Sequence, residues 1–454
     1  MEINLTNAKE MQTIKGFGTS ACWWSQYCTG KAAEDIAELL YGDSGLALNI
    51  YRYNVGGGTD EGNCRVTNSW RKTESFYVFD REKEDGYYDF SLDKNAVDFM
   101  KLCLSKGNID TLILFANSPH WSQTSTGQAS GSLLYHTCNI PKMNYKKFVK
   151  YFLDVTEHFL GEGLPVKYIS PINEPQWKWG GSYVWQEGCH YETEELIEIY
   201  HLFAEEIIKR ELPVKLYGPE SGEMLGLTEE YLNAIVKDET IMKVFDIFAY
   251  HSYHSDNNPK TRTEFKDKMV NKHPELRFDM SEWCELPNLS GTKNFKGALI
   301  TARIIGQDLT LAGAESWTAW VAVNQTNIDE NGNDTADAMI SANDNFSQWY
   351  IAERFYAVAH YAKYIPVGSF CLDIGFYPQE SNDFNVFSFR TPENKTVTVI
   401  VNESEDKKVT LQGDFNKMQV ILSTQIEKMK ETCKSEFGSH IHSPANSIIT
   451  VICE

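Results

Sequence analysis

The sequence lacks several features that would assign it to a particular class of protein. Its ten cysteines are dispersed singly, with no CxxC pair and no Cys/His spacing typical of a zinc site. No apolar segment approaches the length of a membrane span. No long basic run offsets the 63 acidic residues, which outnumber 42 basic ones and give a net charge of −21. These absences argue against metal, membrane and nucleic acid as partners.

The start of the chain, MEINLTNAKEMQTIKGFG, has no signal-peptide pattern. We therefore expect the chain as written to be cytoplasmic, or secreted if a leader has been removed. In the cytoplasm its cysteines would be reduced and mostly buried. We expect no cofactor, and the sequence does not indicate an oligomeric state.

What the chain does have is length and aromatic residues. Its 454 residues favour one large domain with a smaller companion, and 42% hydrophobic content suffices for a core. The 24 Phe, 23 Tyr and 11 Trp suit stacking on sugar rings, although most of them belong in a core.

Short apolar runs of β-type alternate with longer segments of helical periodicity. Eight such runs are predicted to be strands, at 13–20, 47–57, 111–121, 168–175, 215–222, 245–253, 277–283 and 315–323. Helices are predicted between them at 31–42, 92–107, 144–163, 193–212 and 295–313, and after the last strand at 346–365. Eight alternations indicate an α/β fold of the closed (β/α)₈ TIM-barrel type, because an open doubly wound sheet seldom reaches eight regular units.

The pattern changes after residue 365. From 366 to 454 short alternating strands are separated by Asn, Gly, Asp and Ser, which predicts an all-β sandwich. We therefore divide the chain into a catalytic barrel at 13–365 and a C-terminal sandwich at 366–454, packed rigidly together. Residues 1–12 are a candidate for an additional strand of the sandwich.

Two glutamates follow strands of the predicted barrel. Glu174 lies in YISPINEPQW and Glu282 in RFDMSEW. Catalytic groups of such barrels lie at the carboxyl ends of the strands, and burying a glutamate there without compensation is costly. Two carboxylates in one bowl are what retaining glycoside hydrolysis needs, one as acid/base and one as nucleophile, about 5–5.5 Å apart. The alternative is that both are ordinary solvated glutamates.

The motifs GFGTSACWW, YRYNVGGG, NSPHW, SPINEPQW and MSEW, in this order, resemble family 30 of the glycoside hydrolases, in the clan of retaining (β/α)₈ glycosidases. The resemblance covers nearly the whole chain, and GFGTSACWW and PQWKWGG most resemble the endo-β-1,6-galactanase-like branch. It implies that Glu174 is the acid/base and Glu282 the nucleophile. Two departures are Pro119-His120 in place of a proline doublet and the missing signal peptide, which favours imported oligosaccharides.

The resemblance also implies substrate-binding residues. Asn173 matches the asparagine that contacts the sugar 2-hydroxyl, and Arg52 matches an arginine that would keep Glu282 ionised. Either His251 or Tyr253, with Tyr253 slightly favoured, would donate a hydrogen bond to the nucleophile. Aromatic walls and outer platforms for the sugar are expected from Trp121, Trp177, Trp179 and Trp320. His251 and His254 are three residues apart and could suggest a metal site, but the sequence shows no third ligand for it.

The predicted function is therefore retaining hydrolysis of β-glycosidic bonds, with β-1,6-linked galactan or its oligosaccharides as the substrate. An exo-acting β-glucosidase, β-galactosidase, β-fucosidase or β-xylosidase of the same family is the first alternative. A non-catalytic carbohydrate-binding barrel is the second. A Schiff-base aldolase is disfavoured because no lysine ends the strands concerned, and no Gly-Lys-Ser/Thr follows the glycine-rich segment as a phosphate loop would require.

Overall fold

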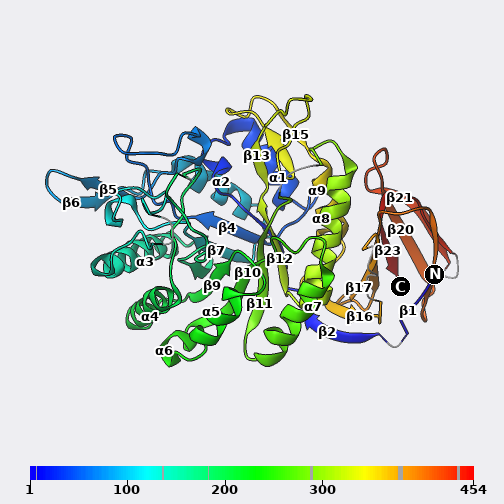
Figure 1. Cartoon of the computed structure of the whole chain (residues 1–454). Helices are drawn as coiled ribbons and strands as arrows, with labels where there is room; N and C mark the ends of the chain where they lie inside the picture. The colour runs from blue at the N-terminus through cyan, green and yellow to red at the C-terminus, as the bar shows by residue number, and fades with distance from the viewer. Residues whose placement is uncertain (7, 135–136, 183, 287–289, 377–381, 437–439) are drawn as a thin grey trace.

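The computed structural model describes the whole chain except residues 7, 135–136, 183, 287–289, 377–381 and 437–439. Its centre is a closed barrel of eight parallel strands, in which each strand pairs with the next and the last pairs with the first (Figure 1). This confirms the predicted barrel and excludes an open sheet. In chain order the strands are β3 (Gly16–Ser20), β4 (Ile50–Asn54), β7 (Thr111–Phe115), β8 (Val166–Ser170), β9 (Lys215–Ser221), β10 (Phe245–His251), β11 (Arg277–Trp283) and β12 (Ser316–Val321).

Helices connect the strands on the outside of the barrel, as parallel pairing requires. They bury residues at intervals of three and four; α4, for example, buries Leu196, Ile199, Tyr200 and Phe203. A capping box formed by Glu192 and Glu195 starts α4. The helices up to β12 are α1 (Gly30–Tyr41), α2 (Lys94–Leu104), α3 (Tyr145–Gly161), α4 (Thr193–Lys209), α5 (Leu227–Ile235), α6 (Glu239–Met242), α7 (Pro259–Lys268) and α8 (Phe295–Gln307).

Some elements differ from the prediction. The helix predicted at 346–365 is wrong in its first part, because β15 (Trp349–Ile351) pairs with β14 (Ile340–Ala342) beside β13 (Val323–Gln325), and α9 (Glu353–Ala362) begins only afterwards. A hairpin of β5 (Tyr77–Asp80) and β6 (Asp85–Tyr88) was not predicted. The predicted alternation also required helices after β9 and β10, where α5, α6 and α7 lie, but it gave no bounds for them. The helix α7 is mostly charged and buries only Arg262 and Phe265.

The C-terminal part is a β-sandwich, as predicted. A seven-stranded sheet runs in the order β2 (Lys9–Thr13), β16 (Phe370–Asp373), β17 (Phe384–Arg390), β18 (Thr396–Asn402), β23 (Ser447–Cys453), β20 (Lys417–Ser423) and β21 (Lys430–Glu436). A second sheet holds β1 (Glu2–Asn4), β19 (Lys407–Gln412) and β22 (Ile441–Ser443). The N-terminal segment thus supplies one strand to each sheet. Apolar side chains from both sheets form one core between them.

The sandwich packs against α8 and α9 of the barrel domain (Figure 1). Gly306 on α8 lies so close to the Phe387 ring that a Cβ atom would be 2.1 Å from it, so no larger residue fits there. From α9, the buried His360 ring contacts the Thr450 hydroxyl at 2.7 Å and the Ser423 hydroxyl at 2.8 Å. These contacts join the two domains through a close-packed interface.

A buried ion pair anchors the loop that follows β10. Asp308, just after α8, accepts hydrogen bonds from Arg262 Nε at 2.7 Å, from the Ser252 hydroxyl at 2.9 Å and from Trp317 Nε1 at 3.1 Å. Asp308 and Arg262 are fully buried. The carboxylate therefore ties α7, the β10 loop and β12 together beneath the carboxyl end of the barrel.

Replacing this carboxylate should destabilise the fold. Asp308→Ala leaves the Arg262 guanidinium buried without its partner, which costs about 3–5 kcal/mol. Urea unfolding followed by circular dichroism measures this, with the exposed Asp414→Ala as control, expected within about 0.5 kcal/mol of wild type. A loss below about 1 kcal/mol for Asp308→Ala would show that the ion pair contributes little.

Among the helices that the structure describes, none has the length and apolar character needed to cross a bilayer. The nine cysteines whose side chains the structure describes are free; Cys64 and Cys138 are half-buried and the other seven are buried. Burial raises the pKa of several of these thiols, including Cys28 and Cys371, each to about 12. Such thiols are poor nucleophiles at neutral pH.

Candidate active site

Six polar side chains meet at the carboxyl-terminal end of the barrel. Arg52 comes from β4, Glu220 from β9, His251 from β10 and Glu282 from β11. Glu174 and Tyr253 come from the loops after β8 and β10. Each is at most 8% exposed. The barrel therefore brings together residues as far as 230 positions apart in the chain.

The apolar run suggested that Glu174 lies at the end of its strand, but the strand ends earlier. β8 ends at Ser170, and Glu174 lies four residues further on with a φ of +47°, in the left-handed region that residues other than glycine seldom adopt. Its N–H donates to the carbonyl oxygen of Glu220 at 2.8 Å. The loop conformation is thus held by a neighbouring strand, which the local sequence does not reveal.

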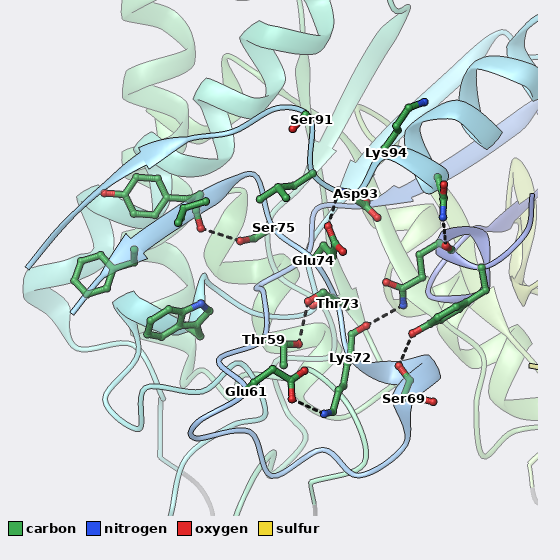
Figure 2. Close-up of a pocket in the computed structure, with 18 residues that line it drawn as sticks. Thr59, Glu61, Ser69, Lys72, Thr73, Glu74, Ser75, Ser91, Asp93 and Lys94 are labelled. Carbon is green, nitrogen blue, oxygen red and sulfur yellow. Dashed lines mark hydrogen bonds and ion pairs between the residues drawn. The ribbon is translucent and has the colours of Figure 1, made fainter. Parts of the chain in front are cut away.

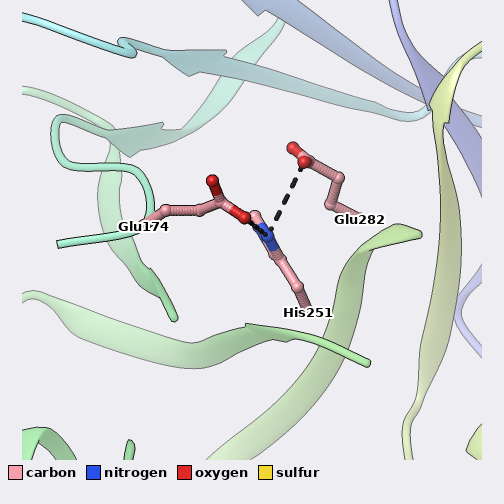
Figure 3. A group of neighbouring side chains, drawn as sticks. All are labelled: Glu174, His251 and Glu282. Atoms are coloured by element: carbon pink, nitrogen blue, oxygen red, sulfur yellow. Dashed lines mark hydrogen bonds and ion pairs between the residues drawn. The ribbon is translucent and has the colours of Figure 1, made fainter. Parts of the chain in front are cut away.

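Glu174, His251 and Glu282 form a compact cluster (Figure 3). His251 Nδ1 lies 3.1 Å from a Glu174 carboxylate oxygen and 3.6 Å from a Glu282 oxygen. One oxygen of each carboxylate and one ring nitrogen all lie within 4.8 Å of one another. Oxygens of the two carboxylates are therefore close enough for the paired carboxyl groups that retaining glycoside hydrolysis uses.

Arg52 lies beneath the cluster and joins two carboxylates. Its Nη1 is 3.2 Å from Glu282 and its Nη2 is 3.1 Å from Glu220, and all three side chains are buried. Arg52 follows Ile50, a residue of the barrel's interior layer, by two positions, so both side chains point inward. The predicted proximity of Arg52 to Glu282 is thus present in the structure.

Burial raises the pKa of the Glu282 carboxyl to about 7, and Glu174 and Glu220 act in the same direction, whereas His251 and Arg52 oppose them. Arg52 therefore favours the ionised form of Glu282 but does not by itself offset burial. Tyr253 donates a hydrogen bond to Glu282 at 3.2 Å, the contact that the sequence favoured for it. That bond also favours the carboxylate.

The other two charged groups respond to their neighbours. Burial alone would raise the pKa of the Glu220 carboxyl, but Arg52 and His251 outweigh it and lower this pKa to about 2. Burial alone would lower the pKa of the His251 imidazole, but Glu282, Glu174 and Glu220 outweigh it and raise this pKa to about 10. At neutral pH Glu220 is therefore an anion and His251 a cation.

The same cluster has to be considered as a metal site, because Glu174 and Glu282 would supply the ligands that the sequence did not show beside His251. In this structure His251 is an ion-pair partner of the carboxylates. Its Nε2 lies 3.4 Å from Glu220 while its Nδ1 faces Glu174, and as an imidazolium it carries a proton on both nitrogens. Binding of a metal ion would require one of these nitrogens to lose its proton.

Asn173 and the loop tryptophans lie beside Glu174. Asn173 donates from Nδ2 to Asn117 at 3.1 Å, while its buried Oδ1 has no hydrogen-bond partner among the residues described. Trp179 Nε1 donates to the Glu174 carbonyl at 3.2 Å. A Cβ atom on Gly222 would lie 2.3 Å from Trp177 Nε1 and 2.9 Å from Glu174 Oε1, so Trp177 borders the carboxylate.

Two further tryptophans pack together where β3 and β12 adjoin. Trp320 and Trp23 meet edge to face with ring centroids 5.3 Å apart, and Arg71 lies over the Trp23 ring at 5.1 Å. The buried Trp23 Nε1 has no hydrogen-bond partner among the described residues. Trp23, from the motif GFGTSACWW, was not predicted as a site residue, although it packs against Trp320, which was predicted as one.

Trp121 lies elsewhere on the same face of the barrel. It contacts Phe79 edge to face and carries Arg81 over its ring at 4.8 Å. It lines a cavity of about 980 Å³ under the loop that bears β5 and β6 (Figure 2), and neither Glu174 nor Glu282 is in the cavity wall. The polar wall residues labelled in Figure 2 include Thr59, Glu61, Lys72, Glu74 and Asp93.

The residue most clearly missed by sequence reasoning is Glu220, in KLYGPESG. It satisfies the criterion applied to Glu174 and Glu282, since it is a glutamate near the end of an apolar strand. A chemistry that needs two carboxylates gives no reason to look for a third. Ser281, which donates a hydrogen bond to Glu220, was missed for the same reason.

Comparisons with known proteins agree with this arrangement. The family model described as "O-Glycosyl hydrolase family 30" matches residues 1–332, and that of the "Glycosyl hydrolase family 30 beta sandwich domain" matches residues 368–451. An endo-β-1,6-galactanase of Hypocrea rufa is 23% identical over 220 residues, which are 44% of this chain and 45% of that protein. A putative glucosylceramidase 2 of Caenorhabditis elegans is 22% identical over 482 aligned positions, covering 99% of this chain and 83% of that protein.

Among solved structures, a conserved exported protein from Bacteroides fragilis superimposes with a TM-score of 0.85 over 100% of both chains, at 22% identity. At that identity the likeness concerns the fold alone. The barrel, the sandwich and their connection are therefore shared with this structure.

Proposed function

The chain belongs to O-glycosyl hydrolase family 30, and from this membership we propose that it is a retaining β-glycoside hydrolase acting on β-1,6-linked galactan or its oligosaccharides. The observation that carries the chemistry is the pair of carboxylates, Glu174 and Glu282, with oxygens within 4.8 Å of each other. The relative named as an endo-β-1,6-galactanase supports the linkage and the sugar.

In the proposed reaction Glu282 attacks the anomeric carbon while Glu174 protonates the departing glycosidic oxygen. The bond from the anomeric carbon to the aglycone breaks as the bond to Glu282 forms. In the second step Glu174 removes a proton from water, which attacks the same carbon and releases Glu282. Two inversions give net retention of the β configuration.

The surrounding residues have roles in this scheme. Asn173 Oδ1 is buried without a partner, and a sugar 2-hydroxyl would satisfy it. Arg52 and Tyr253 hold Glu282 in place, at 3.2 Å each. Trp177 and Trp320 are our choices for apolar walls of the sugar site, with Trp179 as a more distant platform. Trp121 would contact only a longer substrate, since it lines the neighbouring cavity.

A second candidate is an exo-acting β-glucosidase. The relative named as a putative glucosylceramidase aligns with 99% of this chain, whereas the galactanase match covers 44%. Sugars that differ by one hydroxyl orientation are separated by contacts worth a few kcal/mol, so a broad match does not decide between them.

A substrate panel tests the proposal. β-1,6-galactobiose and longer β-1,6-galacto-oligosaccharides are compared with β-1,6-linked glucobiose and with aryl β-galactosides, β-glucosides, β-fucosides and β-xylosides. We expect the highest kcat/KM on β-1,6-galacto-oligosaccharides. A preference for the glucosides would favour the second candidate, and binding without turnover of any of them would favour a carbohydrate-binding protein.

The pH dependence should show the buried nucleophile. Because burial raises the pKa of Glu282 to about 7, the reactive carboxylate becomes populated as pH rises through 7. We expect kcat/KM to fall by about tenfold per pH unit on the acid side of this value, since this parameter reports groups of the free enzyme. Initial rates between pH 4 and 9 on the best aryl glycoside measure it. An acid limb at the ordinary glutamate value would contradict the expectation.

A further inference from the structure

We propose that Glu220 is a positioning residue for the reaction: its buried carboxylate orients Arg52 and His251 and, as a fixed negative charge, leaves Glu174 and Glu282 with one proton to share. The inference rests on the proposed function, because the proposed hydrolysis needs one protonated and one ionised carboxyl at the same time. Glu220 itself lies beneath the cluster and acts through its neighbours.

Glu220 contacts Arg52, His251, Ser281 and the backbone of Glu174. One oxygen lies 3.1 Å from Arg52 Nη2 and the other 3.4 Å from His251 Nε2. The Ser281 hydroxyl donates to the second oxygen. The carbonyl of Glu220 also accepts the Glu174 N–H at 2.8 Å. Glu220 therefore contacts Arg52, the partner of Glu282, and His251, the partner of Glu174. It also accepts a hydrogen bond from the backbone of Glu174.

The charges of this group can be counted. Arg52 and His251 are cations and Glu220 is an anion, so together they carry one positive charge. A buried group of this kind is most stable when its net charge is zero. Neutrality is reached when Glu174 and Glu282 together carry one negative charge, which means one proton between them. That is the protonation state from which the proposed reaction starts.

Other titratable groups around the cluster do not change the count. Burial raises the pKa of each neighbouring phenol and thiol well above its ordinary value, so all stay neutral over the working range. They are Tyr200 on α4, Tyr217 on β9, Tyr253 after β10, Cys22 after β3 and Cys284 after β11.

Glu220→Gln keeps the shape of the side chain and removes its charge. The remaining fixed groups then carry two positive charges, which favour ionisation of both Glu174 and Glu282. We expect the acid limb of the pH profile of kcat/KM, which reports Glu282, to move to lower pH by about one unit, because a lost like charge lowers the pKa of its neighbour.

Two variants serve as controls. Glu187→Gln removes another buried carboxylate, bonded to Asn54, Thr73 and the Gly57 N–H, and should leave the acid limb in place. Glu220→Asp restores the charge and should restore the acid limb even where kcat is lower. A loss of activity in Glu220→Gln with an unmoved acid limb would assign Glu220 a purely structural role and overturn the proposal.

A measurement on the wild type does not depend on folding of any Glu220 variant. The His251 ring nitrogens, assigned by comparison with His251→Asn, should give ¹⁵N signals of an imidazolium at pH 8.5. A neutral ring at that pH would break the charge count and overturn the proposal. This readout also separates the two inferences: if the wild type hydrolyses none of the glycosides, the proposed function fails, whereas the His251 signal still tests the role of Glu220.

Discussion

Glu282→Gln should lower kcat by about 10⁴-fold or more on every substrate of the wild type. The amide has the size of the carboxylate but cannot form the glycosyl-enzyme, so the reaction loses its first step. A factor of 10⁴ corresponds to about 5.4 kcal/mol of transition-state stabilisation. Release of the aryl alcohol from the best aryl β-glycoside, followed at the optimum pH, measures the loss.

The matched control is Glu285→Gln, three residues further along the chain, just after β11. Glu285 is buried and paired with Arg354 and Ser290, so its replacement affects stability and not the cluster of Glu174, His251 and Glu282. Thermal unfolding by circular dichroism shows whether each variant is folded. Residual activity of folded Glu282→Gln near the wild-type level, or equal losses in both variants, would exclude Glu282 as the nucleophile.

Glu174→Ala should lose activity according to the leaving group. Without the acid, glycosides with poor leaving groups should be hydrolysed about 10²–10⁴-fold more slowly, whereas those with strongly acidic phenols should form the glycosyl-enzyme nearly as before. Azide can attack the glycosyl-enzyme without help from a base, whereas water needs Glu174 to remove its proton. Added azide should therefore accelerate turnover and give a β-glycosyl azide. Rates with and without azide, and NMR of the product, are the measurements.

The control for this variant is Glu192→Ala, at the capping box of α4, which should show no azide effect. If the loss in Glu174→Ala is the same for all leaving groups and azide has no effect, Glu174 is not the acid/base. An α-glycosyl azide would point to direct displacement and would also contradict the assignment.

Most of the barrel could be predicted because parallel strands between helices carry a strong apolar signal. The eight predicted strands all overlap the observed ones, and β11 has the predicted ends, 277 to 283. The signal failed where tertiary pairing decides the structure. The spacing of apolar residues at 346–352 resembles a helix, but Trp349–Ile351 pairs with β14 instead. The polar α7 gave no apolar stripe to detect.

The candidate site could be predicted in part for a similar reason. Glu282 was predicted from the end of its strand and Arg52 from the family resemblance, and the structure places them 3.2 Å apart. The positions of Glu174 and Trp121 depend on loops whose shape is set by distant backbone contacts. Glu220 became visible only when Arg52, His251 and Glu282 were seen around it, since its partners lie 31 to 168 residues away.

The stereochemistry of the first product tests the central claim most directly. ¹H NMR of the anomeric region, recorded during the first minutes of hydrolysis of the best substrate, distinguishes the sugar released with β configuration from the α-anomer formed later by mutarotation. Two carboxylates with oxygens within 4.8 Å predict the β-anomer first. Initial release of the α-anomer would show a single displacement and would contradict the account.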